Sequence, residues 1–219
     1  MLETMQDAAR ALDHLLVGSQ TLEQGLDWLE AKTGVRGVRG GSHPGLGTWN
    51  ALASLGPRQY VEIIAPDPAQ AGAETFYVPG LRDLRAPRVV AWAASGVGLV
   101  SRFTSTLPAD LSCEPARRGT RVRPDGRRLS WTLAFPRHRL HGTFAGALPF
   151  FIEWDDAEMH PGGNAPSGLR LRTLTLRHQD SEVLRSALAS LGIDAEVQRA
   201  ERESIRVELD TPRGLVVLE

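Results

Sequence analysis

The sequence has a single cysteine, Cys113, so no disulfide can form within the chain and no cysteine-based zinc cage can be built. It also lacks any apolar run near the roughly 20 residues that a membrane-spanning helix needs. The first ten residues, MLETMQDAAR, contain acidic side chains and no apolar segment, unlike a secretory signal. These absences predict a cytoplasmic protein with no membrane partner.

An excess of charge of either sign is also missing. The 25 Lys and Arg residues nearly balance the 26 Asp and Glu residues, and the formal net charge is -1. No overall field therefore attracts nucleic acid. The arginines between residues 117 and 128 are not interleaved with the aromatic residues on which the bases of single-stranded nucleic acid stack. We expect no nucleic-acid partner.

The first part of the chain, residues 10–66, has the pattern of a strand, a helix and further strands. Residues 11–18, ALDHLLVG, are typical of a buried strand. The segment TLEQGLDWLEAKTG carries a leucine stripe, Thr21 and Gln24 fit a capping box, and Gly34 suits the position that ends a helix. A glycine-rich loop, a strand near TWNALASLG and the strand YVEIIAP complete this part.

The second part, residues 88–155, repeats the same order. RVVAWAAS indicates a strand, and GLVSRFTSTL indicates a helix with a weaker apolar stripe. RVRPDGRRLSWTLAF is typical of a β-hairpin, because Pro-Asp-Gly favours a turn and apolar residues alternate behind it. ALPFFIEWDD is the expected closing strand.

A third, shorter part is expected over residues 169–219. Its strand LRLRTLTLRH has an alternation that slips near Thr173, as at a β-bulge, and Asp180 begins a helix. Linkers rich in Pro, Gly, Ala and Asp fall near residues 67–87 and 156–168. Repeats of this length cannot each close a core, so they should pair their sheets. The fold class is therefore α+β, with helices outside curved mixed sheets.

One stretch stands out for its glycines: GGSHPGLGTWN, from Gly40 to Asn50. It connects the first helix to strands that should line a cleft. Its glycines permit tight turns, and Pro44 stiffens one of them. The stretch can therefore hold His43 and Asn50 at the mouth of the cleft. Two interpretations stay open: these side chains contact a substrate, or the stretch is a rigid hairpin that shapes the cleft.

These patterns together resemble a known family. LDHLLVG, LDWLEAKTGVR, GGSHPGLGTWNALASLG and YVEIIAPDP are similar to the glyoxalase-like domain group of the vicinal oxygen chelate superfamily. RVRPDG, LSW and LPFFIEW resemble that group's second module, so the resemblance covers roughly residues 10–165. It implies tandem βαβββ modules, of which the first two form a cupped sheet around a cleft. The third would extend or brace the sheet.

The resemblance also implies where a metal would bind. In members that use a metal, side chains from the first and last strand of each paired module hold a divalent cation. Mapped onto this sequence, those positions are His14, Glu62, Trp92 and Glu153. A tryptophan is no ligand, so the expected metal set is His14, Glu62 and Glu153. One imidazole with two carboxylates suits Zn, Mn, Ni or Fe(II).

The residues themselves support the same set. His14 alternates with Leu12 and Leu16, and Glu62 and Glu153 each alternate with apolar neighbours. A polar group on an inward apolar row costs free energy unless it is paired or bound to a metal. Glu62 or Glu153 could then also serve as the catalytic base. The alternatives stay open: either glutamate faces solvent or an arginine, and His14 is a satisfied core histidine.

Further side chains are candidates for substrate contact. Arg121 and Arg123 share a strand face and could clamp a carboxylate or phosphate, or simply protect a solvated hairpin edge. Trp92 could form a stacking floor. The remaining candidates are His43, Trp49 and Asn50, with Trp49 either stacking on a ligand or covering the sheet.

The leading hypothesis for function is a lyase- or isomerase-type enzyme that acts on a small oxygenated molecule, with a divalent metal in the cleft. The second hypothesis is a metal-free small-molecule binding or resistance protein of the same fold. A third is a structural protein that dimerises through exposed sheet edges. A homodimer is compatible with each of them.

Overall fold

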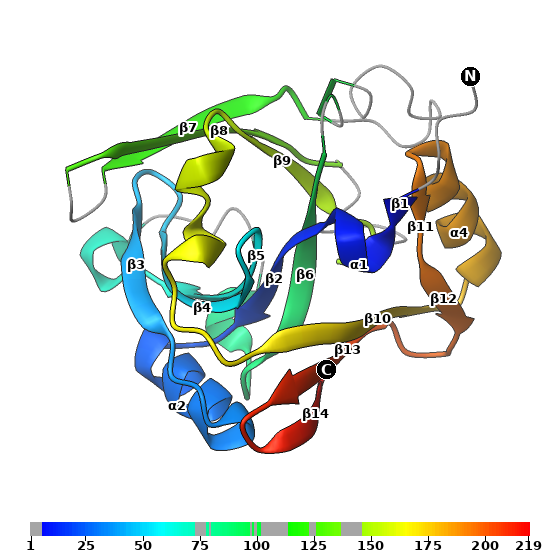
Figure 1. Ribbon diagram of the computed structural model, residues 1–219, viewed down its shortest axis with the longest axis horizontal. Coiled ribbons are helices and arrows are strands. Elements are labelled where there is room, and N and C mark those ends of the chain that lie inside the picture. The colour runs from blue at the N-terminus through cyan, green and yellow to red at the C-terminus, as the bar shows by residue number, and fades with distance from the viewer. Residues whose placement is uncertain are drawn as a thin grey trace.

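The computed structural model describes residues 6–72, 78, 80–96, 98, 100–101, 114–122, 126–136 and 146–219. Eight strands form a large sheet that curls around a central space, with helices on its outside (Figure 1). In their order across the sheet, these strands are β3 (Val38–His43), β4 (Thr48–Gly56), β5 (Gln59–Pro66), β2 (Leu12–Gly18), β6 (Arg88–Ser95), β9 (Phe150–Trp154), β8 (Arg128–Ala134) and β7 (Arg117–Val122).

The large sheet has two halves with the same pairing. In the first half, the first strand β2 pairs in parallel with the last strand β5. In the second half, β6 pairs in parallel with β9, and the antiparallel pair β2–β6 joins the halves. This strand pairing is that of the cupped sheet that the resemblance implies, so the predicted fold class is confirmed. The helix expected at GLVSRFTSTL lies largely outside the described residues.

Helix α2 (Leu22–Thr33) forms where the sequence predicts it. The Thr21 hydroxyl accepts a hydrogen bond from the backbone N–H of Gln24 at 3.2 Å, which satisfies one of the free donors at the helix start. Gly34 ends the helix with φ at 80°, a conformation that favours glycine. The leucine stripe of α2 is buried against the outer face of the sheet, and together they form part of the main hydrophobic core.

The third part forms a separate four-stranded sheet in the order β12-β10-β13-β14. Its first strand lies between its second and third, unlike the pairing in the two halves of the large sheet. The predicted slip near Thr173 is present as a register shift between Leu171 and Thr173. The elements of this part and of the N-terminal segment are β1 (Gln6–Asp7), α1 (Ala8–Ala11), β10 (Arg170–His178), α4 (Ser181–Ser190), β11 (Ile193–Asp194), β12 (Glu196–Arg199), β13 (Ser204–Thr211) and β14 (Gly214–Leu218).

The two faces of the large sheet belong to different clusters of buried side chains. The outer face packs against α2 and the small sheet in one large core, which includes Leu15, Trp92 and Phe151. The inner face forms a smaller cluster, which includes Leu16, Phe150 and Ile152. Short 3-10 turns, at Pro68–Gln70, Leu81–Asp83, Ala157–Met159 and Pro161–Gly163, lie in the connections. No helix among the described residues is long and apolar enough to cross a membrane.

Candidate functional site

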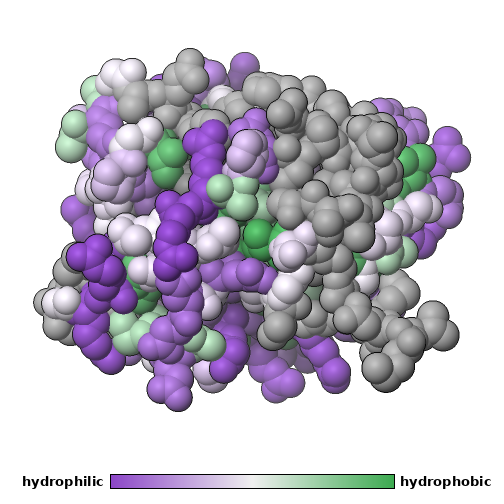
Figure 2. All heavy atoms as spheres, turned by 90° about the horizontal axis from the view of Figure 1, so that it is seen from above, coloured by the Kyte–Doolittle hydropathy of each residue, from purple (hydrophilic) through white to green (hydrophobic). Residues whose placement is uncertain are grey.

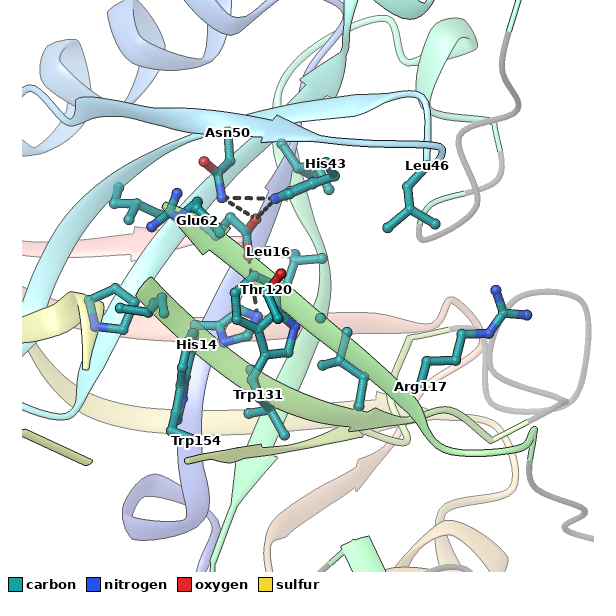
Figure 3. A pocket seen from close by; sticks show the side chains of 18 of the residues that line it. His14, Leu16, His43, Leu46, Asn50, Glu62, Arg117, Thr120, Trp131 and Trp154 are labelled. Atoms are coloured by element: carbon teal, nitrogen blue, oxygen red, sulfur yellow. Dashed lines mark hydrogen bonds and ion pairs between the residues drawn. The ribbon is translucent and has the colours of Figure 1, made fainter. Parts of the chain in front are cut away.

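The inner face of the curled sheet encloses a cavity of about 430 Å³, a size typical of small-molecule sites. Its lining includes the polar side chains of His14, His43, Asn50, Tyr60, Glu62 and Arg121. All of these except Arg121 come from the first half of the sheet. The second half contributes most of the apolar lining, including Leu133, Phe150 and Ile152. Figure 3 shows Asn50, His43 and Glu62 pointing toward one another, with His14 beside them.

An irregularity in β2 sets the position of the first polar pair. The register with β6 shifts between Leu12 and His14, as at a β-bulge, where alternation of side chains between the faces is interrupted. Leu12 lies in the outer core, while Asp13 and His14 contact each other at 2.7 Å. Strict alternation along β2 would put Asp13 on the face of Leu15 and Val17, and Leu12 on the face of His14. The bulge overturns both assignments.

Asp13 is a buried carboxylate that accepts three hydrogen bonds. The Trp154 indole donates to its Oδ2 at 2.9 Å, His160 Nε2 lies 3.1 Å from the same oxygen, and His14 Nδ1 lies 2.7 Å from Oδ1. The backbone N–H of Gly162 donates to His160 Nδ1, so Nε2 is the ring atom that carries the proton to Asp13. Burial raises the pKa of Asp13, but the two histidine hydrogen bonds outweigh it and lower that pKa from 3.8 to about 2.

The ionised Asp13 fixes the orientation of His14. Because Nδ1 donates to Asp13, Nε2 is the atom that faces Glu62, whose Oε2 lies 3.3 Å away. The Tyr60 ring stacks on the imidazole at 4.6 Å and holds its plane. The result is an acid–base pair inside the cavity, with its imidazole anchored from behind.

Asn50 holds the other oxygen of Glu62. The backbone N–H of Gly41 donates to Asn50 Oδ1 at 3.0 Å, which turns the amide nitrogen toward Glu62 Oε1 at 2.8 Å. The same nitrogen lies 3.2 Å from His43 Nε2, so Nε2 accepts and His43 Nδ1 donates to the Thr48 hydroxyl at 2.9 Å. Burial lowers the pKa of His43, which favours this neutral form. GGSHPGLGTWN thus presents His43 and Asn50 to the cavity.

Tyr60 contributes a hydroxyl that stays protonated. Burial, followed by the nearby charges of Glu62 and Asp13, raises its pKa well above the ordinary value of 10.0. Its side chain lines the cavity beside His14. The phenol is therefore available as a hydrogen-bond donor to a ligand oxygen throughout the neutral pH range.

The outer strand β7 brings arginines to the cavity rim. Figure 2 views the molecule from the side of β7 and β8, where hydrophilic side chains gather. Arg117 and Arg118 are exposed and pair with Glu114 and Asp155 respectively. Figure 3 shows Arg117 pointing away from the polar cluster. Arg121 is half-buried and lines the cavity, while the predicted partner Arg123 lies outside the described residues.

Three predicted site residues lie elsewhere. Trp49 packs against the outer core, and its ring lies 5.3 Å from the Arg39 guanidinium carbon. Trp92 is fully buried in the outer core and donates to the Ala147 carbonyl at 2.9 Å, so it is not a stacking floor. Glu153 also points away from the cavity, where its Oε1 accepts from the backbone N–H of Val100 at 3.4 Å. These three expectations are corrected, because each side chain lies on the outer face.

The described residues do not fit the metal site that the resemblance implies. Of the expected ligands, only His14 and Glu62 reach the cavity, and the inner-face residues of β6 and β9 include Ala93 and Ile152, which have no donor atom. His43 Nε2 lies 3.7 Å from Glu62 Oε1, and the Asn50 amide nitrogen already donates to both atoms. Within the described ranges, no three His, Cys, Asp or Glu side chains are arranged to hold a metal ion.

The sequence interpretation missed the roles of Asp13, Tyr60 and His160. A signal for Asp13 was present, since two adjacent polar residues in an apolar strand indicate a bulge that turns both to one side. Alternation along β5 puts Tyr60 on the face of Glu62, but gives it no function. His160 lies in a loop, where a histidine is usually exposed, yet it is only 4% exposed because Pro161–Gly163 packs this loop onto the sheet.

Comparisons with known proteins agree with this architecture. The family model of the glyoxalase-like domain matches residues 12–192. A solved structure of a hypothetical protein from Staphylococcus aureus is 12% identical, with 94% of this chain and 83% of that chain covered and a TM-score of 0.62. Methylmalonyl-CoA epimerase from Mycobacterium tuberculosis is 18% identical, covers 70% of this chain and 91% of that chain, and has a TM-score of 0.42.

A methylmalonyl-CoA epimerase from Streptomyces coelicolor is 14% identical, covers 64% and 92% of the two chains, and also has a TM-score of 0.42. No curated protein matches the chain. The likeness to the staphylococcal structure shows a common fold. The family model covers most of the chain, including the strands that build the cavity. The chain therefore belongs to the glyoxalase-like domain family.

Proposed function

We propose that the chain binds a small oxygenated molecule in its cavity and transfers a proton on it, in lyase- or isomerase-type chemistry. The observation that carries this proposal is the contact of Glu62 Oε2 with His14 Nε2 at 3.3 Å, inside a cavity of small-molecule size. A positioned carboxylate and imidazole are the groups that general acid–base catalysis uses, and they contribute about 10²–10⁴-fold to a rate.

The reaction starts at Glu62. Its carboxylate takes a proton from a carbon next to a carbonyl group, and the electron pair of that C–H bond moves toward the carbonyl oxygen to form an enolate. His14 Nε2 is the nearest receiver for the proton on Glu62, because Asp13 holds the opposite nitrogen and stabilises the imidazolium. The Tyr60 phenol can donate a hydrogen bond to the enolate oxygen. Return of the proton to a neighbouring atom gives an isomer, and loss of a leaving group gives a lyase product.

A second function is favoured by the aromatic wall of the cavity. Trp131 and Trp154 lie 5.4 Å apart, and both line the cavity with Phe150. Such a wall suits the sequestration of a planar apolar ligand without chemistry, as in a metal-free binding or resistance protein. In that case the polar cluster would orient the ligand rather than transform it.

Exchange of carbon-bound protons for deuterium tests the first function. The protein is incubated in D₂O with 2-hydroxy ketones, 2-hydroxy aldehydes and 2-oxo acids, and loss of the α-proton signal is followed by NMR. We expect exchange with at least one class, and a fall of about 10²-fold or more in Glu62→Gln. Glu153→Gln is the matched control, because Glu153 lies on the outer face and should leave the rate unchanged.

Binding without exchange separates the two functions. If a compound shifts the melting temperature and its α-proton never exchanges, the proton-transfer proposal fails and the sequestration function stands. If exchange occurs at equal rates in wild type and Glu62→Gln, the assignment of Glu62 as the base is wrong. A homodimer and a cytoplasmic location stay predictions from the sequence.

A further inference from the structure

The arginines of the cavity rim differ in their partners. Arg117 lies 3.4 Å from Glu114, and Arg118 forms an ion pair with Asp155. Arg121 makes no ion pair or side-chain hydrogen bond with any residue in the part of the chain that the structure describes. Its side chain lines the cavity all the same. A half-buried guanidinium without a protein carboxylate is costly unless a ligand supplies the anion.

Arg121 lies where the two edges of the large sheet approach each other. Strands β3 and β7 are at opposite ends of the strand order, yet a Cβ added to Gly40 would lie 3.0 Å from Arg121 Nη1. The same Cβ would lie 2.2 Å from Asn50 Oδ1. The missing side chain at Gly40 thus leaves room for the guanidinium beside the Asn50 amide. The glycine pair of GGSHPGLGTWN brings this cation next to the polar cluster.

No carboxylate of the described cavity lining forms an ion pair with Arg121. Glu62 is engaged by His14 and Asn50, and not by Arg121. His43 is neutral, because burial lowers its pKa and Arg121 contributes to the same shift. Within the described lining, Arg121 is therefore a guanidinium with no carboxylate in direct contact, beside the Asn50 amide.

From this arrangement we propose that the substrate is a small carboxylic acid whose carboxylate binds Arg121, with its reacting carbon toward Glu62. This inference rests on the proposed function where it concerns the reaction. The contact between Arg121 and the carboxylate, called the anchor below, can be tested by binding alone. The planar guanidinium offers paired N–H groups that match a carboxylate. A phosphate monoester brings about 1.5 to 2 negative charges, more than one unpaired arginine balances. The class that fits is therefore the 2-oxo and 2-hydroxy monocarboxylic acids.

Matched pairs of acids and amides test the anchor. Binding of lactate, mandelate and phenylpyruvate is measured by calorimetry against the corresponding primary amides, which have nearly the same shape and no charge. We expect the wild type to bind at least one acid on the order of ten- to a hundredfold more tightly than its amide. Arg121→Ala should remove this preference, and Arg121→Lys should restore part of it.

Arg128→Ala is the matched control. Arg128 begins β8 in the same hairpin, is exposed and does not line the cavity, so its loss should leave the acid preference unchanged. Circular dichroism and the melting temperature show whether each variant keeps the fold. The affinity for the uncharged amides gives a second readout, because it should be the same in wild type and Arg121→Ala.

Three results would overturn the proposal: equal affinity for acids and amides, an acid preference that survives in Arg121→Ala, or tighter binding of phosphate monoesters such as phosphoglycolate than of the acids. Absence of binding by every acid in the set would count against it as well. A preference that depends on Arg121, without any α-proton exchange, would support the anchor and refute only the proton transfer.

Discussion

Asp13 is the residue on which the geometry of the cavity depends most. It lies at the β2 bulge and accepts hydrogen bonds from three side chains that come from distant parts of the chain. Its charge orients His14 toward Glu62 and fixes the loop of His160 against the sheet. A buried carboxylate of this kind stabilises the fold only while all its donors are present and it remains ionised.

Replacement of Asp13 by Asn should therefore destabilise the protein. We expect a loss of about 3 kcal/mol in the free energy of unfolding near neutral pH, since an amide cannot accept from all three donors. Because the pKa of Asp13 is lowered from 3.8 to about 2 in the folded state, its ionisation stabilises the fold above pH 3.8. This contribution, about 2 kcal/mol, is lost as the pH falls through 2.

Urea denaturation of wild type and Asp13→Asn, from about pH 7 down to about pH 2.5, measures this difference. The difference in the free energy of unfolding between the two proteins should become smaller in the acidic part of the range. Asp27→Asn is the control, because Asp27 is an exposed partner of Arg36 and should change stability by less than about 1 kcal/mol. A gap that stays constant with pH would show that the charge of Asp13 does not stabilise the fold.

The sequence predicts some of the individual residues of the cavity. His14 and Glu62 could be assigned to the cavity, because each is a polar residue in an apolar strand with clear alternation. His43 and Asn50 could be placed at the cavity through their glycine-rich context. The role of Asp13 could not, since a bulge depends on the pairing with β6, which the local pattern of β2 does not contain.

At the scale of elements, α2 lies unusually close to the sheet. A Cβ added to Gly25 in the middle of this helix would lie 2.4 Å from Ile63 Cγ2 on β5 and 3.1 Å from the Ser19 Cβ. The glycine costs helix propensity, by about 1 kcal/mol relative to alanine. It nevertheless allows the helix to pack directly on the strand that carries Glu62.

Two opposing effects decide the outcome of Gly25→Ala. Overpacking at such a contact costs about 1–3 kcal/mol, which exceeds the gain in helix propensity. We expect a net loss of up to about 2 kcal/mol in the free energy of unfolding, measured by urea denaturation. In a double-mutant cycle, Ile63→Ala should cost less in the Gly25→Ala background than in wild type. A variant that is more stable than wild type would show that the helix can move away without loss.

Elements with one buried face were predicted well, because their apolar residues recur at the helix or strand period. Strands with both faces buried were predicted less well. The helix α2, the β7–β8 hairpin and the bulge in β10 all follow from periodicity and turn residues. The strands β6 and β9 read as continuous apolar runs, so alternation could not tell which face carries Trp92 and Glu153. The different strand order of the four-stranded sheet could not be predicted either, because strand order depends on tertiary contacts and not on the local pattern.

For the whole molecule, the two halves of the sheet share a topology and differ in chemistry. The first half supplies the carboxylate, the imidazoles and the amide of the cavity. The second half supplies apolar walls and the single unpaired guanidinium of the described lining, at Arg121. The fold of the family is thus retained while half of the expected ligand positions face the outer core. The central claim is that the cavity acts through its own acid–base pair.

The metal content of the purified protein tests this claim most directly. After dialysis against Zn²⁺, Mn²⁺ and Ni²⁺ in turn, and removal of free metal, bound metal is measured by mass spectrometry for wild type and His14→Ala. Because only His14 and Glu62 of the expected ligands reach the cavity, and no three ligand side chains in the described ranges are arranged for a metal, we predict far less than one metal ion per chain and no difference between the two proteins. One bound ion per wild-type chain that is lost in His14→Ala would contradict the account.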